Sequence, residues 1–331
     1  MTGIFLIFSA CILWALDTLV RYPLLFSGVS PWSIVWFEHL FLVLVMLYWM
    51  RPLWRKALFD RRALLAFLVV GGLGSAVSTV AFTNAFTLIN PSVVILIQKL
   101  QPLVAVTLAA VLLKERVDRH FVFWLGVCLL GSLLIAAGDL MPALQPANWA
   151  GRESRDLLLG YGCTLIAVLG WGAATVFGKQ LSNRGFSTTD LMSGRFLVGF
   201  LVLTPLAWLL ASPTEVLDMQ MPLQFLGEGP TFNVLTLIAA MVLISGLGGM
   251  GFYYLGMQRL PARTCAVAEM FFPVAAVIIN WLVLGQTLTA LQIVGAAVLL
   301  GGSTMVALSQ SAQTPAATRG SSANESVTAP D

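Results

Sequence analysis

Residues 91–116 read PSVVILIQKLQPLVAVTLAAVLLKER, and the part from 91 to 113 contains a single charged side chain, that of Lys99. A helix needs about 20 predominantly apolar residues to cross the hydrocarbon core of a bilayer. Lipid offers the peptide backbone no hydrogen-bond partners, so a run of this length must satisfy its own backbone groups. The stretch is therefore predicted to be a membrane-spanning helix.

The rest of the chain has the same apolar character. Of its 331 residues, 58% are hydrophobic and 10% are charged, whereas soluble domains carry about 25% charged residues. In water such a chain could not cover its surface with polar groups, so its solvent is expected to be the lipid bilayer. The net charge of +3 gives no reason to expect a nucleic-acid partner.

Ten segments have the length and composition of a spanning helix, which predicts an all-α membrane protein with ten transmembrane helices. No basic region precedes the first apolar run, so we interpret this run as a span and not as a cleaved signal peptide. Residues 309–331 are rich in Ser, Thr, Ala and Pro and are expected to form a disordered cytoplasmic tail. The predicted spans are approximately 3–20, 32–50, 63–83, 91–113, 121–138, 157–178, 189–210, 232–254, 263–284 and 288–308.

Lys and Arg in the loops predict the orientation, because cytoplasmic loops of membrane proteins carry an excess of both. With the N-terminus inside, twelve fall in cytoplasmic loops and three fall outside. An even number of spans then places both termini in the cytoplasm, and the expected location is the cell inner membrane. The twelve are Arg51, Arg55, Lys56, Arg61, Arg62, Lys114, Arg116, Arg119, Lys179, Arg184, Arg259 and Arg263, and the three are Arg21, Arg152 and Arg155.

The two halves of the chain share matches that occur in the same order. At an offset of 157 residues, Trp14 corresponds to Trp171. At the same offset, Glu38 falls on Arg195, and at an offset of 171 Pro102 corresponds to Pro273. The other matches pair Gly72-Leu73-Gly74 with Gly246-Leu247-Gly248, Leu113-Lys114-Glu115-Arg116 with Leu284-Gly285-Gln286-Thr287, and Leu125-Gly126 with Val294-Gly295.

These matches predict an internal repeat with residues 3–138 as the first five-helix unit and residues 157–308 as the second. Residues 139–156 would form an external linker between them. Because each unit has an odd number of spans, the second copy enters the membrane from the opposite side. Inverted repeats of this kind are typical of secondary transporters, which bind their solute at the interface between the repeats.

The sequence resembles the drug/metabolite transporter superfamily, specifically its EamA-like members, over residues 3–308. The resemblance implies a ten-helix carrier with a central cavity, which often exports amino acids or other small metabolites. The family position matched by Arg195 is commonly basic in both halves, whereas the first half here has Glu38. The residues that carry the resemblance are Leu13-Trp14, the run Pro91–Arg116 with Pro102 and Leu113-Lys114-Glu115, Leu125-Gly126, Trp171, Arg195, Pro273, Leu284-Gly285-Gln286 and Gly295.

Charged residues inside spans are costly and often functional. The corresponding helices of the two units carry an acid and a base with exchanged signs, which predicts two ion pairs. One would join Glu38 to Lys99 and the other would join Arg195 to Glu269. Two interpretations remain open: the pairs are static links between helices, or their members face the cavity and bind solute or protons.

Further polar and aromatic residues are candidates for the same site. Lys99 is the leading one, with Gln98 beside it as an amide partner for a carboxylate. Trp14 and Trp171 either line the cavity or pack in the core, and His39 either titrates or caps a local hydrogen bond. The remaining in-span acid, Asp17, is expected to extend to the membrane interface together with Arg21.

Small residues and prolines indicate where the spans approach closely or bend. The glycine-rich stretches at 71–75 and 245–251 are expected to let helices pack closely. Pro102 and Pro273 are each expected to free a backbone carbonyl within a span. The four cysteines, Cys11, Cys128, Cys163 and Cys265, lie singly in apolar runs and are interpreted as small buried side chains.

No motif for ATP hydrolysis, metal binding or nucleophilic catalysis occurs in the sequence, so we expect no enzyme activity, catalytic residue, metal site or cofactor. The predicted function is secondary transport of a small metabolite such as an amino acid, and the expected direction is export. The partners would be that solute and the lipid bilayer, with protons as a candidate coupling ion, and nothing specifies an oligomeric state. The alternative is an intramembrane enzyme or a non-transporting membrane subunit.

Overall fold

The computed structural model describes residues 2–57, 60–113, 119–143, 152–223, 230–257, 259–260, 265 and 268–311. Within them, eight helices are long and apolar enough to cross a membrane, and two further apolar helices are shorter. The predicted all-α membrane fold with ten spans is confirmed. The predicted tail beyond residue 311 and the run Lys114-Glu115-Arg116 lie outside the described residues.

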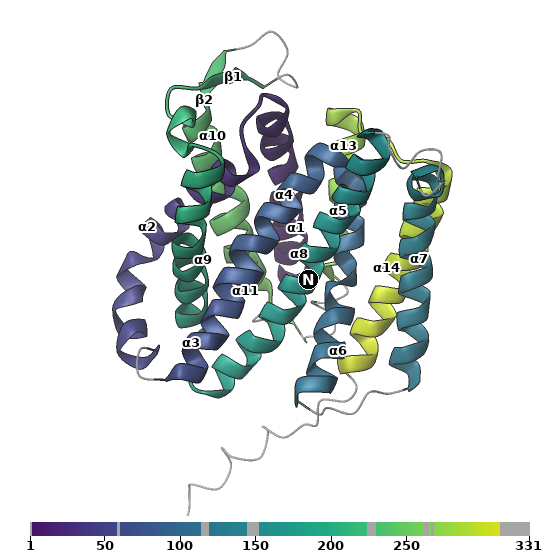
Figure 1. The fold of residues 1–331 in the computed structure, drawn as a ribbon. Coiled ribbons are helices and arrows are strands. Elements are labelled where there is room, and N and C mark those ends of the chain that lie inside the picture. The colour runs from purple at the N-terminus through teal and green to yellow at the C-terminus, as the bar shows by residue number, and fades with distance from the viewer. Residues whose placement is uncertain are drawn as a thin grey trace, which may run out of the picture.

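Among the described residues, six of the spans are single helices, three are interrupted, and the ninth is represented by α13 (Figure 1). The single helices are α1 (Thr2–Phe26), α2 (Pro31–Ala57), α7 (Arg119–Ala143), α8 (Arg152–Asn183), α9 (Thr188–Leu210) and α14 (Ala290–Ser311). The third span is α3 (Arg61–Phe67), the π-helix η1 (Leu68–Val77) and α4 (Ser78–Leu88), and the fourth is α5 (Pro91–Ile97), the 3₁₀ turn η2 (Gln98–Leu100) and α6 (Gln101–Leu113). The eighth is α10 (Val234–Met241), the π-helix η6 (Val242–Gly248) and α11 (Gly249–Met257), and the ninth is α13 (Phe271–Leu284).

The loop between the seventh and eighth spans has structure of its own. It contains a 3₁₀ turn, η4 (Pro213–Val216), and an antiparallel pair of short strands, β1 (Gln220–Pro222) and β2 (Thr231–Asn233). These strands lie at the upper end of the bundle in Figure 1, above α10. The sequence predicted only a loop here, because strands of three residues carry no periodicity that could be recognised.

Polar side chains define where several helices begin. The Asn90 and Asn233 side chains accept hydrogen bonds from backbone N–H groups in the first turns of α5 and α10. Ser187 and Asp190 form a reciprocal capping box at the start of α9. Such caps satisfy N–H groups that have no partner within the helix. They therefore fix the residue at which each of these helices begins.

The helices pack in pairs that repeat between the two halves. Helix α2 packs on α9, and α7 lies beside α14 at one edge of the bundle (Figure 1). The contact of α1 with α11 has its counterpart in that of α8 with η1 and α4, and the contact of α1 with α13 has its counterpart in that of α8 with α6. This arrangement is that of two five-helix units related by an approximate two-fold axis.

The two units run in opposite directions. The Asn90 side-chain amide donates to the Thr287 carbonyl over 2.8 Å, so the start of the fourth span lies beside the end of the ninth, its counterpart. At the other end of the bundle, Arg184 after α8 pairs with Asp60 before α3. The repeat is therefore inverted, as the odd number of spans in each unit predicted.

The two matched prolines produce the same backbone turn in each half. A proline inside a helix leaves the carbonyl four residues earlier without its usual donor. For Pro102 that carbonyl belongs to Gln98 and accepts from the Gln101 N–H. For Pro273 it belongs to Glu269 and accepts from the Phe272 N–H over 3.1 Å. In each turn the hydrogen bond joins a carbonyl to the N–H of the residue three positions later. Gln98 and Glu269, which provide the two carbonyls, are therefore structural equivalents.

The glycine-rich stretches adopt π-helix in both halves, which the sequence analysis did not predict. Gly72-Leu73-Gly74 lies in η1 and Gly246-Leu247-Gly248 lies in η6. Their neighbourhood also shows the expected close packing, because a Cβ atom on Gly74 would lie 2.3 Å from the Cβ of Ala174 and one on Gly249 would lie 2.5 Å from the indole nitrogen of Trp14. Short π-helical segments often occur at functional sites.

All four cysteines are free, and Cys11, Cys128 and Cys265 are buried as predicted, while Cys163 is partly exposed.

Helices α7 and α14 meet through two facing glycines, which makes their contact sensitive to any added side chain. A Cβ atom on Gly295 would lie 2.7 Å from the backbone nitrogen of Ile135 and 2.8 Å from the Gly131 carbonyl oxygen. We expect Gly295→Val to destabilise the protein by about 1–3 kcal/mol through overpacking, measured as a lower Tm in detergent. Gly301→Val on the same helix is the control, because a Cβ atom there meets nothing within 4 Å; equal Tm values for the two variants would contradict the packing argument.

Candidate functional site

A cavity of about 230 Å³ lies between the two repeats. Its walls come from α1, α2, η1, α4, α5 and η2 of the first half and from α9, η6, α11 and α13 of the second. Solute sites of transporters with inverted repeats lie at this interface. Its polar residues include Asp17, Glu38, His39, Ser75, Gln98, Arg195 and Ser245, and its aromatic residues are Trp14, Phe82, Phe86, Phe196 and Phe272.

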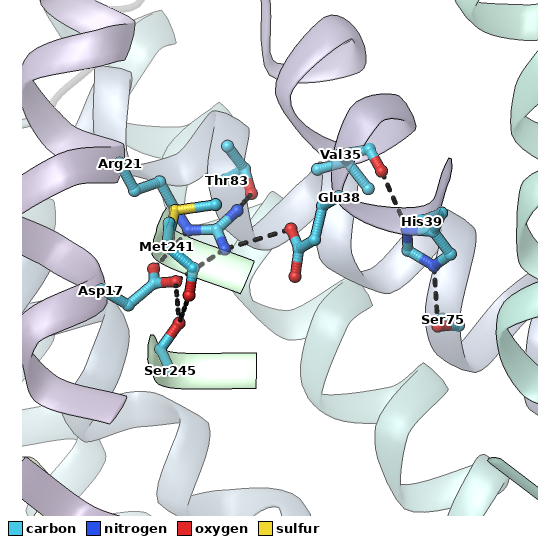
Figure 2. Close-up of polar contacts among 9 residues, drawn as sticks. All are labelled: Asp17, Arg21, Val35, Glu38, His39, Ser75, Thr83, Met241 and Ser245. Carbon is cyan, nitrogen blue, oxygen red and sulfur yellow. Dashed lines mark hydrogen bonds and ion pairs between the residues drawn. The ribbon is translucent and has the colours of Figure 1, made fainter. Parts of the chain in front are cut away.

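One guanidinium group organises the polar wall of this cavity. Arg21 Nε lies 2.6 Å from an Asp17 carboxylate oxygen, and Arg21 Nη2 lies 3.1 Å from Glu38 Oε2 (Figure 2). Arg21 also donates to the hydroxyl of Thr83 over 3.0 Å. The second half contributes Ser245, whose hydroxyl lies 3.0 Å from Asp17. The group therefore joins the first three spans to the eighth.

The prediction that Asp17 and Arg21 extend together to the membrane interface is wrong. The Arg21 residue is only 4% exposed, and Asp17 lines the cavity. Two neighbouring carboxylates and a hydroxyl bind the guanidinium inside the bundle, so the side chain does not need to reach water. The i, i+4 spacing indicated the pair correctly, but Glu38 and Thr83 come from other helices, and their approach is visible only in the tertiary structure.

A second hydrogen-bond chain connects His39 to the opposite wall. His39 Nδ1 lies 2.8 Å from the Val35 carbonyl, which can only accept, so this nitrogen carries the proton. The Ser75 hydroxyl lies 2.9 Å from His39 Nε2 (Figure 2). Arg195 Nε donates to the same Ser75 oxygen over 3.3 Å. His39 is 1% exposed, and this geometry assigns it as a neutral imidazole held by local hydrogen bonds.

The two ion pairs predicted from the repeat are wrong. Glu38 pairs with Arg21, while Arg195 donates to Ser75 and to the Gly74 carbonyl in η1. Arg21 of α1 takes the place predicted for Lys99, and η1 provides two acceptors for Arg195. The spacing of a repeat predicts which positions are equivalent in the two halves. It does not predict which side chains are in contact.

Lys99 and Glu269 form a separate cluster beside the cavity. The Lys99 ammonium lies 5.1 Å from the centre of the Phe272 ring, and the Phe272 N–H donates to the Glu269 backbone carbonyl. Glu269 accepts a hydrogen bond from the Tyr253 hydroxyl. Neither Lys99 nor Glu269 is among the residues that line the cavity. Phe272 therefore contacts both of these residues and also lines the cavity.

Gln98 lines the cavity, whereas Gln101 is not among the lining residues. Gln101 Nε2 lies 3.5 Å from the Thr175 hydroxyl on α8. Gln98 Oε1 is buried and has no hydrogen-bond partner in the part of the chain that the structure describes. A buried acceptor without a donor is uncommon in folded proteins, which makes this atom a candidate contact for a bound solute.

The two matched tryptophans have different positions. Trp14 lines the cavity and contacts Phe272 edge-on, with 6.2 Å between ring centres. Trp171 does not line it and packs against the ring of Phe82, with 5.1 Å between centres. Of the eight candidate residues, the cavity therefore brings together Trp14, Glu38, His39, Gln98 and Arg195 and leaves out Lys99, Glu269 and Trp171.

We expect Arg21→Met to lower stability strongly. Removing the guanidinium leaves two carboxylates in the bundle without a partner, and breaking a buried ion pair in this way costs about 3–5 kcal/mol. The measurement is the Tm of purified protein, with the exposed Arg61→Met as the control. The triple variant Asp17→Asn, Arg21→Met, Glu38→Gln should recover much of the loss, because no charge remains unpaired; a single variant as stable as the wild type would contradict this account.

Comparison with known proteins agrees with this architecture. The chain is 27% identical over 308 residues to a protein of Fusobacterium nucleatum subsp. nucleatum named riboflavin transporter ImpX, and the match covers 90% of this chain and 95% of that one. A solved crystal structure with 16% sequence identity aligns over 94% of this chain and 99% of its own, with a TM-score of 0.54. This second likeness shows a shared fold.

A model of the EamA-like transporter family matches residues 1–137 and 158–308, which together make up most of the chain. Ten apolar helices, a cavity between two repeats and this match lead to one conclusion: the chain is a multi-pass membrane protein that belongs to the EamA-like transporter family.

Proposed function

We propose that the chain is a secondary carrier for a small planar aromatic metabolite and that riboflavin is the first solute to test. Transport would follow alternating access, in which the two repeats rock about the cavity between them. The cavity with its aromatic and polar walls is the observation that carries this proposal. The direction expected from the sequence, export, belongs to the same proposal.

The lining of the cavity suits a molecule with a flat apolar part and a hydroxyl-bearing part. Solute sites are mostly apolar and aromatic, with a few placed polar groups that provide specificity. Here Trp14, Phe82 and Phe272 offer ring surfaces, while Asp17 and Ser245 offer hydrogen-bonding groups. Riboflavin combines a planar ring system with a chain of hydroxyl groups, and the name of the Fusobacterium relative supports it as the substrate.

Amino acids, the class expected from the sequence, are the second candidate. Arg195 and the carboxylates of Asp17 and Glu38 place both charge signs on the wall of one cavity. A zwitterion would need both. Arg21 already neutralises part of the negative charge, which favours an uncharged solute over a zwitterion.

We assign different roles to the two polar clusters. Trp14, Glu38, His39, Gln98 and Arg195 would contact the solute, because they line the cavity. Lys99 and Glu269 are the proposed site for a coupling proton, because a base lies over the Phe272 ring and an acid lies three residues before Phe272 in the same turn. Trp171 would support the wall through its contact with Phe82.

Transport can be measured with protein reconstituted in liposomes. We expect the wild type to exchange internal riboflavin for labelled external riboflavin, and Trp14→Ala to reduce the rate at least about tenfold, because it removes an aromatic wall of the site. Phe5→Ala on the same helix is the control, since Phe5 is 66% exposed on the outside of the bundle. Exchange of amino acids without exchange of riboflavin would overturn the flavin proposal and favour the second candidate.

The proposed orientation places both termini in the cytoplasm of a cell whose inner membrane holds the protein. A fluorescent protein fused to the C-terminus should therefore fluoresce, whereas alkaline phosphatase fused to the same site should be inactive, because it folds only outside the cytoplasm. The reverse pair of results would contradict the orientation predicted from the Lys and Arg distribution.

A further inference from the structure

We propose that Gln98 determines the selectivity of the carrier by binding the amide edge of a planar heterocycle, meaning a ring carbonyl beside a ring N–H. The inference rests on the proposed function and names the chemical group that its site would recognise. Any solute with this edge belongs to the class, and the flavin ring, with an N–H between two carbonyls, is the member tested below.

The backbone holds Gln98 at the cavity wall. It is the first residue of the 3₁₀ turn η2, and Pro102 prevents the α-helical hydrogen bond that its carbonyl would otherwise accept. The carbonyl is bound instead by the Gln101 N–H. Ile95, one turn earlier, also lines the cavity. The position of the side chain thus depends on a break in the helix that the equivalent Glu269 shares.

The Gln98 amide has hydrogen-bonding capacity that the protein does not use. Its Oε1 atom is buried without a partner among the described residues. Because a buried acceptor without a donor destabilises the structure, such an atom calls for an explanation. The oxygen is enclosed in this conformation, so a rotation of the terminal amide would bring it to the cavity. A solute N–H that binds it there would supply the missing donor.

Several other polar groups of the cavity already bind protein partners. The carboxylates of Asp17 and Glu38 bind Arg21, and both ring nitrogens of His39 have partners. Gln98 differs from them because a carboxamide carries an acceptor and a donor side by side in one plane. A ring carbonyl and N–H have the complementary arrangement, so the two can join through a pair of parallel hydrogen bonds.

The neighbouring aromatic residue fits a flat ligand in the same place. Phe272 lines the cavity with Gln98 and follows Glu269, the residue equivalent to Gln98, by three positions. A ring that stacks on an aromatic side chain presents its edge to groups in its own plane. The combination of an amide edge and a ring face would distinguish planar heterocycles from aliphatic amino acids, which have neither.

The test compares riboflavin with 3-methylriboflavin, in which a methyl group replaces the hydrogen of the ring N–H. Binding to purified protein is followed by quenching of flavin fluorescence, for the wild type, Gln98→Leu and the control Gln101→Leu. We expect methylation to weaken binding to the wild type and to Gln101→Leu about tenfold, since one hydrogen-bonded edge is lost. Gln98→Leu should bind riboflavin about tenfold more weakly and distinguish the two ligands less than about twofold.

The outcomes separate this inference from the proposed function. Equal binding of the two flavins by the wild type would overturn the inference and leave the flavin substrate in place. An equal methylation penalty in the wild type and Gln98→Leu would do the same. No riboflavin binding by the wild type would overturn both. The comparison of ligands on the wild type needs no variant to fold, and Gln98→Glu, which keeps the shape but loses the N–H donor, should weaken riboflavin binding as well.

Discussion

Within a membrane, each backbone N–H and C=O group must find its partner inside the protein, and this requirement shapes the whole molecule. Long helices meet it along most of the chain, while Pro102 and Pro273 would each leave one carbonyl unpaired. In both places the N–H of the residue three positions later binds this carbonyl. This 3₁₀-type turn interrupts the helix, and in the first repeat it places the polar side chain of Gln98 at the cavity wall. The backbone constraint therefore creates the place where a solute could be recognised.

The buried charges obey a related constraint, because an ion in lipid needs a counterion or a polar partner. Arg21 provides it for two carboxylates from two helices, and Ser245 connects the group to the second repeat. These residues join helices of both repeats, and Asp17, Glu38 and Ser245 also line the cavity. In the proposed function some of these side chains also face the solute, so neutralising one charge is expected to disturb both the fold and transport. This contact also crosses between repeats, at a junction that any rocking motion must rearrange.

The two halves have equivalent backbones and different chemistry. Gln98 and Glu269 occupy the same turn, yet one faces the cavity and the other binds the hydroxyl of Tyr253. The matched tryptophans also differ: Trp14 lines the cavity, whereas Trp171 packs against Phe82. An inverted repeat by itself would produce a symmetric site. These exchanges give the cavity between the repeats two different walls, which suits the asymmetric solute that we propose.

The sequence by itself determined the membrane fold, the ten spans and the positions of the equivalent prolines, because span length, apolar composition and repeat offset depend only on local order along the chain. It also named five of the cavity residues, since charged and amide side chains inside apolar runs are few. Only the tertiary structure decided the partners: Arg21 displaced Lys99 as the counterion of Glu38, and Lys99 came to lie over Phe272. The reason is geometric. Which side chains meet depends on how helices distant in the chain rotate and cross, and close contacts such as that of Gly74 with Ala174 set those rotations.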